Sequence, residues 1–221
     1  MRLILFDIDG TLLECGFQGR EALNATLDEV FGATGSIDRF DFAGRTDPGI
    51  VLDVLKEAGL AERDILARIP EVRAKYAARL EENLDVERMR LLPGVSATLE
   101  SLARRKDVVL GLVTGNWEPG ARTKLSRFDL NRFFDFGAFG CDAVDRSDLP
   151  PVALERAERL TGRCFHPEEA LIVGDTIHDI SCARAHGIPV LAVATGRTTA
   201  ETLREGGADR VVTDLTEIAD W

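Results

Sequence analysis

The sequence has no long apolar run. None of its apolar stretches approaches the ~18 residues that a membrane-spanning helix needs. The N-terminal Met-Arg leads into a short apolar run that stops at two acids, which is not the pattern of a secretory signal. We therefore expect neither a membrane span nor a signal peptide.

Positive charge and cysteine are both scarce. The 221 residues hold 27 Lys and Arg against 38 Asp and Glu, a net charge of −11. This balance argues against general affinity for nucleic acid or anionic membranes, but not against a small anionic substrate. The four cysteines lie far apart without metal-type spacing, so reduced thiols in a cytoplasmic protein are expected.

Short apolar runs, each followed by a polar residue, are what the sequence does contain. They lack the alternation of half-exposed strands and are typical of strands buried on both faces of a parallel sheet. Helical spacing fills the gaps between them from about residue 92 onward, which predicts a doubly wound α/β sheet. The five expected strands are residues 2–6, 107–113, 169–174, 189–195 and 209–214.

Residues 15–88 have a different pattern, because amphipathic helical stretches follow one another there without a strand. The stretches are residues 19–32, 47–60, 62–69 and 71–84. We expect an all-helical domain over 15–88, inserted after strand one into a core formed by 1–14 and 89–221. Such an insert lies over the carboxyl end of strand one, where open α/β sheets bind ligands.

Polar residues at three strand ends are expected to meet at one edge of this sheet. Asp7 and Asp9 follow the first run, Thr114 follows the second, and Asp175 with Asp179 follows the third. Four carboxylates in one cleft repel each other unless a cation lies among them. Mg²⁺ suits this set, because it takes a few carboxylates together with water and phosphate oxygens.

The same residues suit phosphoryl transfer. Asp7 is placed to act as a nucleophile that forms an aspartyl-phosphate, and Asp9 as the general acid and base. The Thr114 hydroxyl and the backbone amides of Gly115 and Asn116 offer hydrogen-bond donors to phosphate oxygens.

The segments "DIDGTLL", "LVTGN" and "GDTIHD" resemble the first, second and fourth motifs of the haloacid dehalogenase-like (HAD) hydrolase superfamily. The resemblance covers nearly the whole chain, and the insert is similar to that of phosphoglycolate phosphatase-like members. It implies a Rossmann-like core, a mobile helical cap, Mg²⁺ and a covalent aspartyl intermediate. It also implies that Asp7 and Asp175 bind the metal, that Asp9 binds it through its backbone carbonyl, and that Asp179 lies in or beside the metal site.

One departure from this pattern concerns the third motif, which supplies a lysine that neutralises the nucleophile and the phosphate. The four lysines of the chain do not include one just before "LPPVALERA", where the pattern expects it. Arg146 is the nearest cation and carries the charge with a different reach. The alternatives are that Arg146 is a surface residue, or that Lys124 fills the role.

The segment "FAGRTDPGI", residues 42–50, resembles the family's substrate-specificity loop. Gly44 permits a tight turn there, and Arg45 and Thr46 are candidates for contact with the distal end of a substrate. An ordinary helix start, with Thr46 or Asp47 as the N-cap, explains the same residues.

The sequence thus predicts a cytoplasmic, Mg²⁺-dependent phosphatase that acts on a small phosphorylated metabolite. It is expected to bind neither nucleic acid nor membrane, and to be a monomer or a homodimer. A phosphomutase using the same intermediate is one alternative, and a catalytically weak or non-catalytic phosphate-binding relative is another.

Overall fold

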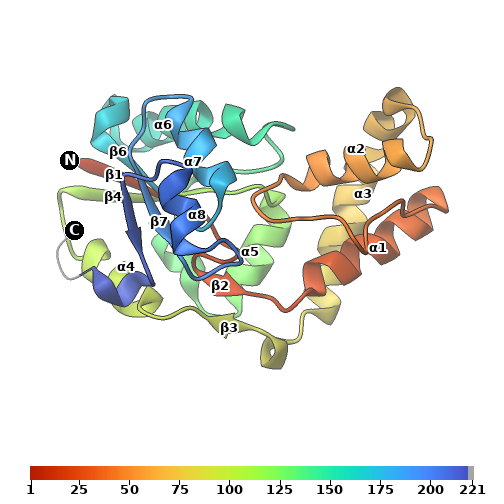
Figure 1. The fold of residues 1–221 in the computed structure, drawn as a ribbon, viewed down its shortest axis with the longest axis horizontal. Coiled ribbons are helices and arrows are strands. Elements are labelled where there is room, and N and C mark those ends of the chain that lie inside the picture. The colour runs from red at the N-terminus through yellow and green to blue at the C-terminus, as the bar shows by residue number, and fades with distance from the viewer. Residues whose placement is uncertain (219–221) are drawn as a thin grey trace.

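The computed structural model describes residues 1–218, so the last three residues of the expected core lie outside the described part. Figure 1 shows the sheet with its surrounding helices at the left and a separate group of helices, the helical lobe, at the right. The helical lobe is defined here as residues 15–88. The α/β class expected from the sequence is confirmed.

The core contains a six-stranded sheet in which every neighbouring pair is parallel, in the order β5-β4-β1-β6-β7-β8. β1 is central, so the residue after it lies between the ends of β4 and β6. The strands are β1 (Arg2–Phe6), β4 (Val108–Val113), β5 (Gly137–Ala138), β6 (Ala170–Gly174), β7 (Val190–Val193) and β8 (Arg210–Val212).

Helices cover both faces of this sheet, which is why its strands are apolar throughout. Successive side chains of a strand point to opposite faces. Leu3 and Leu5 accordingly pack with α6, α7 and α8, while Ile4 and Phe6 pack with α4 and α5. These helices are α4 (Val95–Ala103), α5 (Glu118–Ser126), α6 (Leu149–Thr161), α7 (Ile177–Arg184) and α8 (Ala200–Glu205).

The helical lobe is built from α1 (Gln18–Phe31), α2 (Asp47–Glu57) and α3 (Glu62–Asn83). The expectation of separate helices over 62–69 and 71–84 is wrong, because α3 continues through Pro70. Proline removes one backbone hydrogen bond from a helix. Burial of Ile65 before it and of Val72 and Tyr76 after it holds both halves of α3 against the same neighbours, α1, α2 and α5.

The chain crosses between core and lobe twice, at two short strands that pair with each other. β2 (Leu13–Glu14) runs antiparallel to β3 (Arg90–Leu91), so the outgoing and returning segments lie side by side. The domain boundaries expected near residues 14 and 89 stay a prediction. Short 3₁₀ turns are found at Val86–Arg88, Leu130–Phe133, Arg146–Asp148, Pro167–Glu169 and Leu215–Glu217.

No helix in residues 1–218 combines the length and the apolar character that crossing a bilayer requires.

Candidate active site

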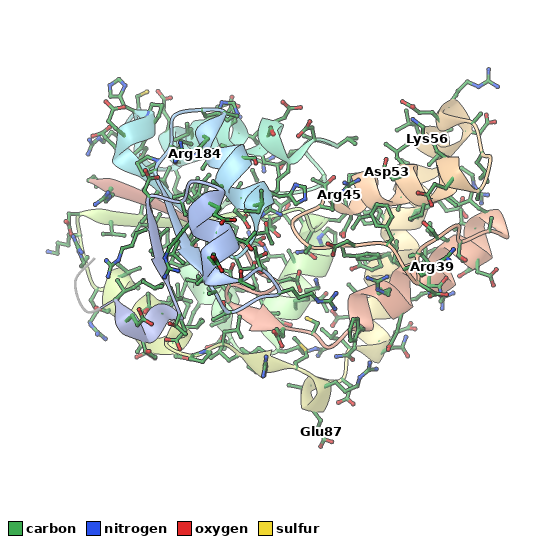
Figure 2. All side chains as sticks on the ribbon, in the orientation of Figure 1. Arg39, Arg45, Asp53, Lys56, Glu87 and Arg184 are labelled. Atoms are coloured by element: carbon green, nitrogen blue, oxygen red, sulfur yellow. The ribbon has the colours of Figure 1, made fainter. Side chains whose placement is uncertain are left out.

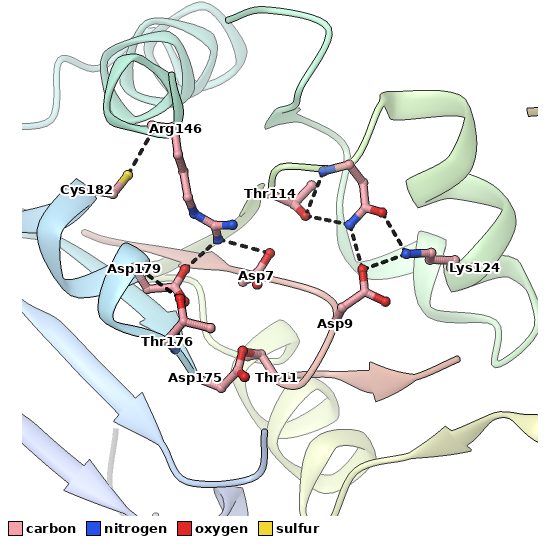
Figure 3. A network of polar contacts seen from close by, with 11 residues as sticks. Asp7, Asp9, Thr11, Thr114, Lys124, Arg146, Asp175, Thr176, Asp179 and Cys182 are labelled. Atoms are coloured by element: carbon pink, nitrogen blue, oxygen red, sulfur yellow. Dashed lines mark hydrogen bonds and ion pairs between the residues drawn. The ribbon is translucent and has the colours of Figure 1, made fainter. Parts of the chain in front are cut away.

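Three buried aspartates form the floor of the site at the carboxyl edge of the sheet (Figure 3). Asp7 follows β1, Asp175 follows β6, and Asp179 is in the first turn of α7. One carboxylate oxygen from each lies within 4.8 Å of the others. The parallel sheet therefore brings together acids that are far apart in the sequence.

Arg146 is the cation that faces this cluster. Its Nη2 lies 3.2 Å from Asp7 Oδ1 and 2.5 Å from Asp179 Oδ1 (Figure 3). The side chain is 7% exposed, so Arg146 is not the surface residue considered above. Its place in the 3₁₀ turn just before α6 directs the guanidinium towards the end of β1.

One arginine does not balance three carboxylates. Burial raises the pKa of Asp7 to about 6, although the Arg146 guanidinium opposes the change. Burial and the nearby carboxylates of Asp179 and Asp7 hold the pKa of Asp175 well above its usual range. The hydroxyl of Thr11 donates to Asp175 Oδ1 at 3.2 Å, a neutral contact that adds no charge. This excess of buried negative charge fits a divalent cation, and oxygen-only ligands suit Mg²⁺.

The backbone around Asp175 is shaped to leave this carboxylate room. A Cβ at Gly196 would lie 1.7 Å from Asp175 Oδ2, so a side chain at position 196 would displace the acid. The loop after β7 therefore approaches the cluster as bare backbone.

Asp9 lies beside this cluster in a second polar group with Asn116, Thr114 and Lys124. Its Oδ2 accepts hydrogen bonds from Asn116 Nδ2 at 2.8 Å and from Lys124 Nζ at 2.6 Å. Asn116 Nδ2 also donates to Thr114 Oγ1 at 2.9 Å, and its Oδ1 accepts from Lys124 Nζ at 2.7 Å. Side chains that follow β1 and β4 are thus joined to α5 (Figure 3).

A cavity of about 380 Å³ lies above both groups and below the helical lobe. Its size is that of a site for a small molecule. From the core it is lined by Asp7, Asp9, Thr114, Gly115, Asn116, Lys124, Arg146 and Asp175; from the lobe by Gly44, Arg45, Asp47, Ile50 and Tyr76, among others.

The loop over residues 42–50 touches the core directly. Asp47 N donates to Gly115 O at 2.8 Å, and Asp47 Oδ2 accepts from Trp117 N at 2.8 Å. Arg45 lies at the junction of core and lobe with Asp53 beside it on α2, and the two form an ion pair (Figure 2). The lobe therefore covers the site in this structure.

Thr46 is the N-cap of α2, as the second interpretation of this loop predicted. Its hydroxyl accepts from Gly49 N at 3.1 Å and donates to Val144 O. It is 3% exposed and lies outside the cavity lining, so the structure does not bring it to the site with Arg45 and Gly44.

Most of the expected site residues line the same cavity or lie directly beside it, and two of them have other contacts than the sequence predicted. The carboxylate of Asp9 is outside the three-acid cluster, and Lys124 contacts Asp9 rather than Asp7. Sequence reasoning did not find the Asn116 side chain or Asp47 as contacts of the site. Asn116 lies only two positions after Thr114, and this closeness was the sequence signal for its side chain.

Comparison with known proteins agrees with this geometry. "Phosphoglycolate phosphatase, plasmid" from Cupriavidus necator is 30% identical over 222 residues, covering 96% of this chain and 89% of that protein. "Phosphoglycolate phosphatase 1" from Pseudomonas aeruginosa is 27% identical over 219 residues, covering 98% and 78%.

Solved structures show the same fold. The crystal structure of a protein described as a predicted phosphatase from Clostridium acetobutylicum superposes with a TM-score of 0.72 at 18% identity, covering 98% of this chain and 95% of that one. Residues 4–193 match the Haloacid dehalogenase-like hydrolase family. With these motifs on this fold, the chain belongs to the haloacid dehalogenase-like hydrolase family.

Proposed function

We propose that this protein is a Mg²⁺-dependent phosphatase that hydrolyses small phosphomonoesters through an aspartyl-phosphate on Asp7. The observation that carries the proposal is the position of Asp7 on the cavity floor, paired with Arg146 and clustered with Asp175 and Asp179. A nucleophilic carboxylate beside a fixed cation is the arrangement that phosphoryl transfer requires.

In the first step an Asp7 oxygen attacks phosphorus and the bond to the ester oxygen breaks. Arg146 holds Asp7 in place by an ion pair and stabilises the charge on the transferring group. Thr114 and Asn116 also line the cavity and are the candidates for binding the phosphoryl oxygens. Asp9 gives a proton to the leaving oxygen.

In the second step Asp9 takes a proton from water, whose oxygen attacks phosphorus and releases Asp7. The carboxylate of Asp9 is 42% exposed and lines the cavity, so it can reach both a leaving group and a water molecule. Mg²⁺ held by Asp7 and Asp175, with Asp179 in or beside the site and the backbone carbonyl of Asp9, would neutralise the buried acids and polarise the phosphoryl group.

The helical lobe acts in this proposal as a cap that closes over the substrate. Its loop covers the cavity through Asp47 and Gly44, and Arg45 faces the cavity from the lobe. Phosphoglycolate is the first substrate to test, because the curated relatives described above carry its name. We further propose that the protein acts in the cytoplasm, where its four free cysteines stay reduced.

The test is release of phosphate from p-nitrophenyl phosphate with Mg²⁺ present. Asp7→Asn is expected to abolish turnover, because an amide does not attack phosphorus, while the circular-dichroism spectrum stays that of the wild type. Asp28→Asn, which removes an exposed carboxylate on α1, is the matched control and should keep full activity. Turnover retained by Asp7→Asn would exclude Asp7 as the nucleophile.

A further inference from the structure

Lys124 is a buried lysine for which the reaction steps above give no role. It is 4% exposed, on the face of α5 that meets both the cavity and the helical lobe. Burying an ammonium group is costly unless it is paired and hydrogen-bonded. Among the described residues, Lys124 Nζ donates hydrogen bonds to Asp9 Oδ2 and to Asn116 Oδ1.

These contacts fix one oxygen of Asp9 and not the other. Lys124 Nζ and Asn116 Nδ2 both donate to Oδ2, so neither of them uses Oδ1. A carboxylate held at one oxygen by two donors has a defined rotamer, and its second oxygen is not used by either donor and can exchange a proton. The Cys15 thiol is a further hydrogen-bond neighbour of the Asp9 carboxylate, and it carries no charge. Asn116 is itself held, because it also donates to Thr114 Oγ1 and accepts from Lys124.

The helical lobe covers the Lys124 end of this ion pair. Tyr76 of α3 packs edge-to-face on Trp117, the residue directly before α5, with 5.6 Å between the ring centroids. A Cβ at Gly19 would lie 3.3 Å from the Tyr76 hydroxyl and 3.9 Å from Lys124 Nζ, so bare backbone of α1 closes the same space. Exclusion of water from Lys124 Nζ lowers the local dielectric constant, which strengthens its ion pair with Asp9.

We propose that Lys124 is a positioning residue for the proton transfer at Asp9. It anchors Oδ2 so that Oδ1 faces the ester oxygen in the first step and the attacking water in the second. The inference rests on the proposed function, since it assigns Asp9 the general acid and base role. Lys124 touches Asp9 and not Asp7, so its effect should follow the need for a proton and not the attack on phosphorus.

The experiment compares p-nitrophenyl phosphate with phenyl phosphate in single-turnover reactions that follow release of the phenol. The two substrates share a ring, but phenol is the poorer leaving group and needs protonation more. Lys124→Met should slow release from phenyl phosphate about 10- to 100-fold and from p-nitrophenyl phosphate no more than about threefold. Lys106→Met, at an exposed position after α4, is the control and should slow neither.

A double-mutant cycle tests whether Lys124 acts through Asp9. For each of the two substrates, the release rates of Asp9→Asn and of Asp9→Asn/Lys124→Met should agree within about twofold. The Asp9 carboxylate on which Lys124 acts is already absent from both variants. The double variant removes both charges of the pair together, so it keeps the test open even where Lys124→Met alone does not fold.

The outcomes separate this inference from the proposed function. Equal slowing of both substrates by Lys124→Met, or a further loss in the double variant, overturns the role of Lys124 while wild-type turnover upholds the phosphatase. A wild-type protein that cleaves neither substrate with Mg²⁺ overturns both.

Discussion

Arg146 differs from a lysine in a way that matters at this site. A single terminal nitrogen, Nη2, contacts both Asp7 and Asp179, while Nε is buried without a hydrogen-bond partner among the described residues. The guanidinium stays charged at any working pH and has a fixed plane. It therefore sets the direction of the Asp7 carboxylate as well as its charge.

Truncation of Arg146 should lower kcat much more than replacement by lysine. Arg146→Ala removes the cation beside Asp7, the proposed nucleophile, and we expect kcat for p-nitrophenyl phosphate to fall by roughly 10²–10³, as for one lost charge-stabilising donor. Arg146→Lys should recover part of this loss, since it restores the charge. Arg159→Ala on the outside of α6 is the control, and an unchanged kcat in Arg146→Ala would move the role elsewhere.

Residue by residue, the sequence predicted best where a side chain directly follows a buried strand. Asp7, Thr114 and Asp175 come straight after β1, β4 and β6, so the sheet alone fixes their place. Lys124 comes ten residues after Thr114 on a helix, and its direction depends on how α5 packs. That packing is tertiary, which is why the partner of Lys124 did not follow from the sequence.

Between elements, the approach of residues 42–50 to the core depends on close backbone contact. Gly44 has φ +67, and a Cβ there would lie 2.5 Å from Thr176 Oγ1 and 2.6 Å from the Cβ of His178. The turn thus needs glycine both for its left-handed backbone and for its contact with α7.

Gly44→Ala should reduce kcat/KM without unfolding the protein. The added methyl group pushes the loop away from α7, and a misplacement of about 1 Å costs up to about 100-fold in rate. Gly59→Ala is the matched control, because Gly59 has φ +88 in the same lobe but open space around its Cβ position. Both variants should lose about 1–2 kcal/mol to backbone strain, and only the first should lose activity. Equal kcat/KM values would show that the loop contact is not needed.

Asp47 links α2 to the core through its hydrogen bond from Trp117 N, and its carboxylate makes the stability of the protein depend on pH. Burial raises the pKa of Asp47 from 3.8 to about 6, although Lys124 and the Trp117 amide oppose the change. Between these values the folded protein binds a proton that the unfolded chain has lost, so stability falls as pH rises through this window. Ionisation of the buried Asp47 carboxyl thus lowers the free energy of unfolding by about 3 kcal/mol, and this loss is fully present above about pH 6.

Asp47→Asn should remove this cost, since the amide oxygen still accepts from Trp117 N. The free energy of unfolding of the variant, relative to wild type, should rise by up to about 3 kcal/mol from pH 4 to pH 7.5. Urea unfolding at both pH values with EDTA present measures it, with Asp28→Asn as the control for one lost carboxylate. A difference that stays constant with pH would contradict the assignment.

Among the elements, all five expected strands are present, because short runs that are apolar throughout are stable where both faces of a parallel sheet are covered. β5 was missed, since Gly137–Ala138 is a two-residue strand at the sheet edge without an apolar run. The break expected at Pro70 was wrong because packing on both sides of it outweighs one lost hydrogen bond.

For the whole molecule, the fold gathers buried carboxylates at one edge of the sheet. The proposed phosphoryl transfer depends on neutralising their negative charge. Arg146 balances part of the charge of Asp7, Asp175 and Asp179, and Lys124 balances Asp9. We expect the remaining charge to make Mg²⁺ binding and folding stability interdependent.

Mg²⁺ should therefore stabilise the protein, and Asp175→Asn should remove this effect. At about 100 times its Kd the ion adds about 2.7 kcal/mol, a rise in Tm of roughly 5–11 °C for a chain of this size. Without metal, Asp175→Asn should melt above wild type, because it removes a buried carboxylate that is costly to ionise. Thermal unfolding with Mg²⁺ and with EDTA measures both effects. A wild-type Tm indifferent to Mg²⁺ would remove the metal site from the account.

The most direct measurement is a rapid acid quench of the wild-type enzyme during turnover of a phosphomonoester with Mg²⁺, followed by peptide mass spectrometry at low pH. We expect a phosphoryl group on the N-terminal peptide, at Asp7, which appears within the first turnover and is absent from Asp7→Asn. Turnover that continues with no phosphoryl group on this peptide at any quench time would contradict this expectation.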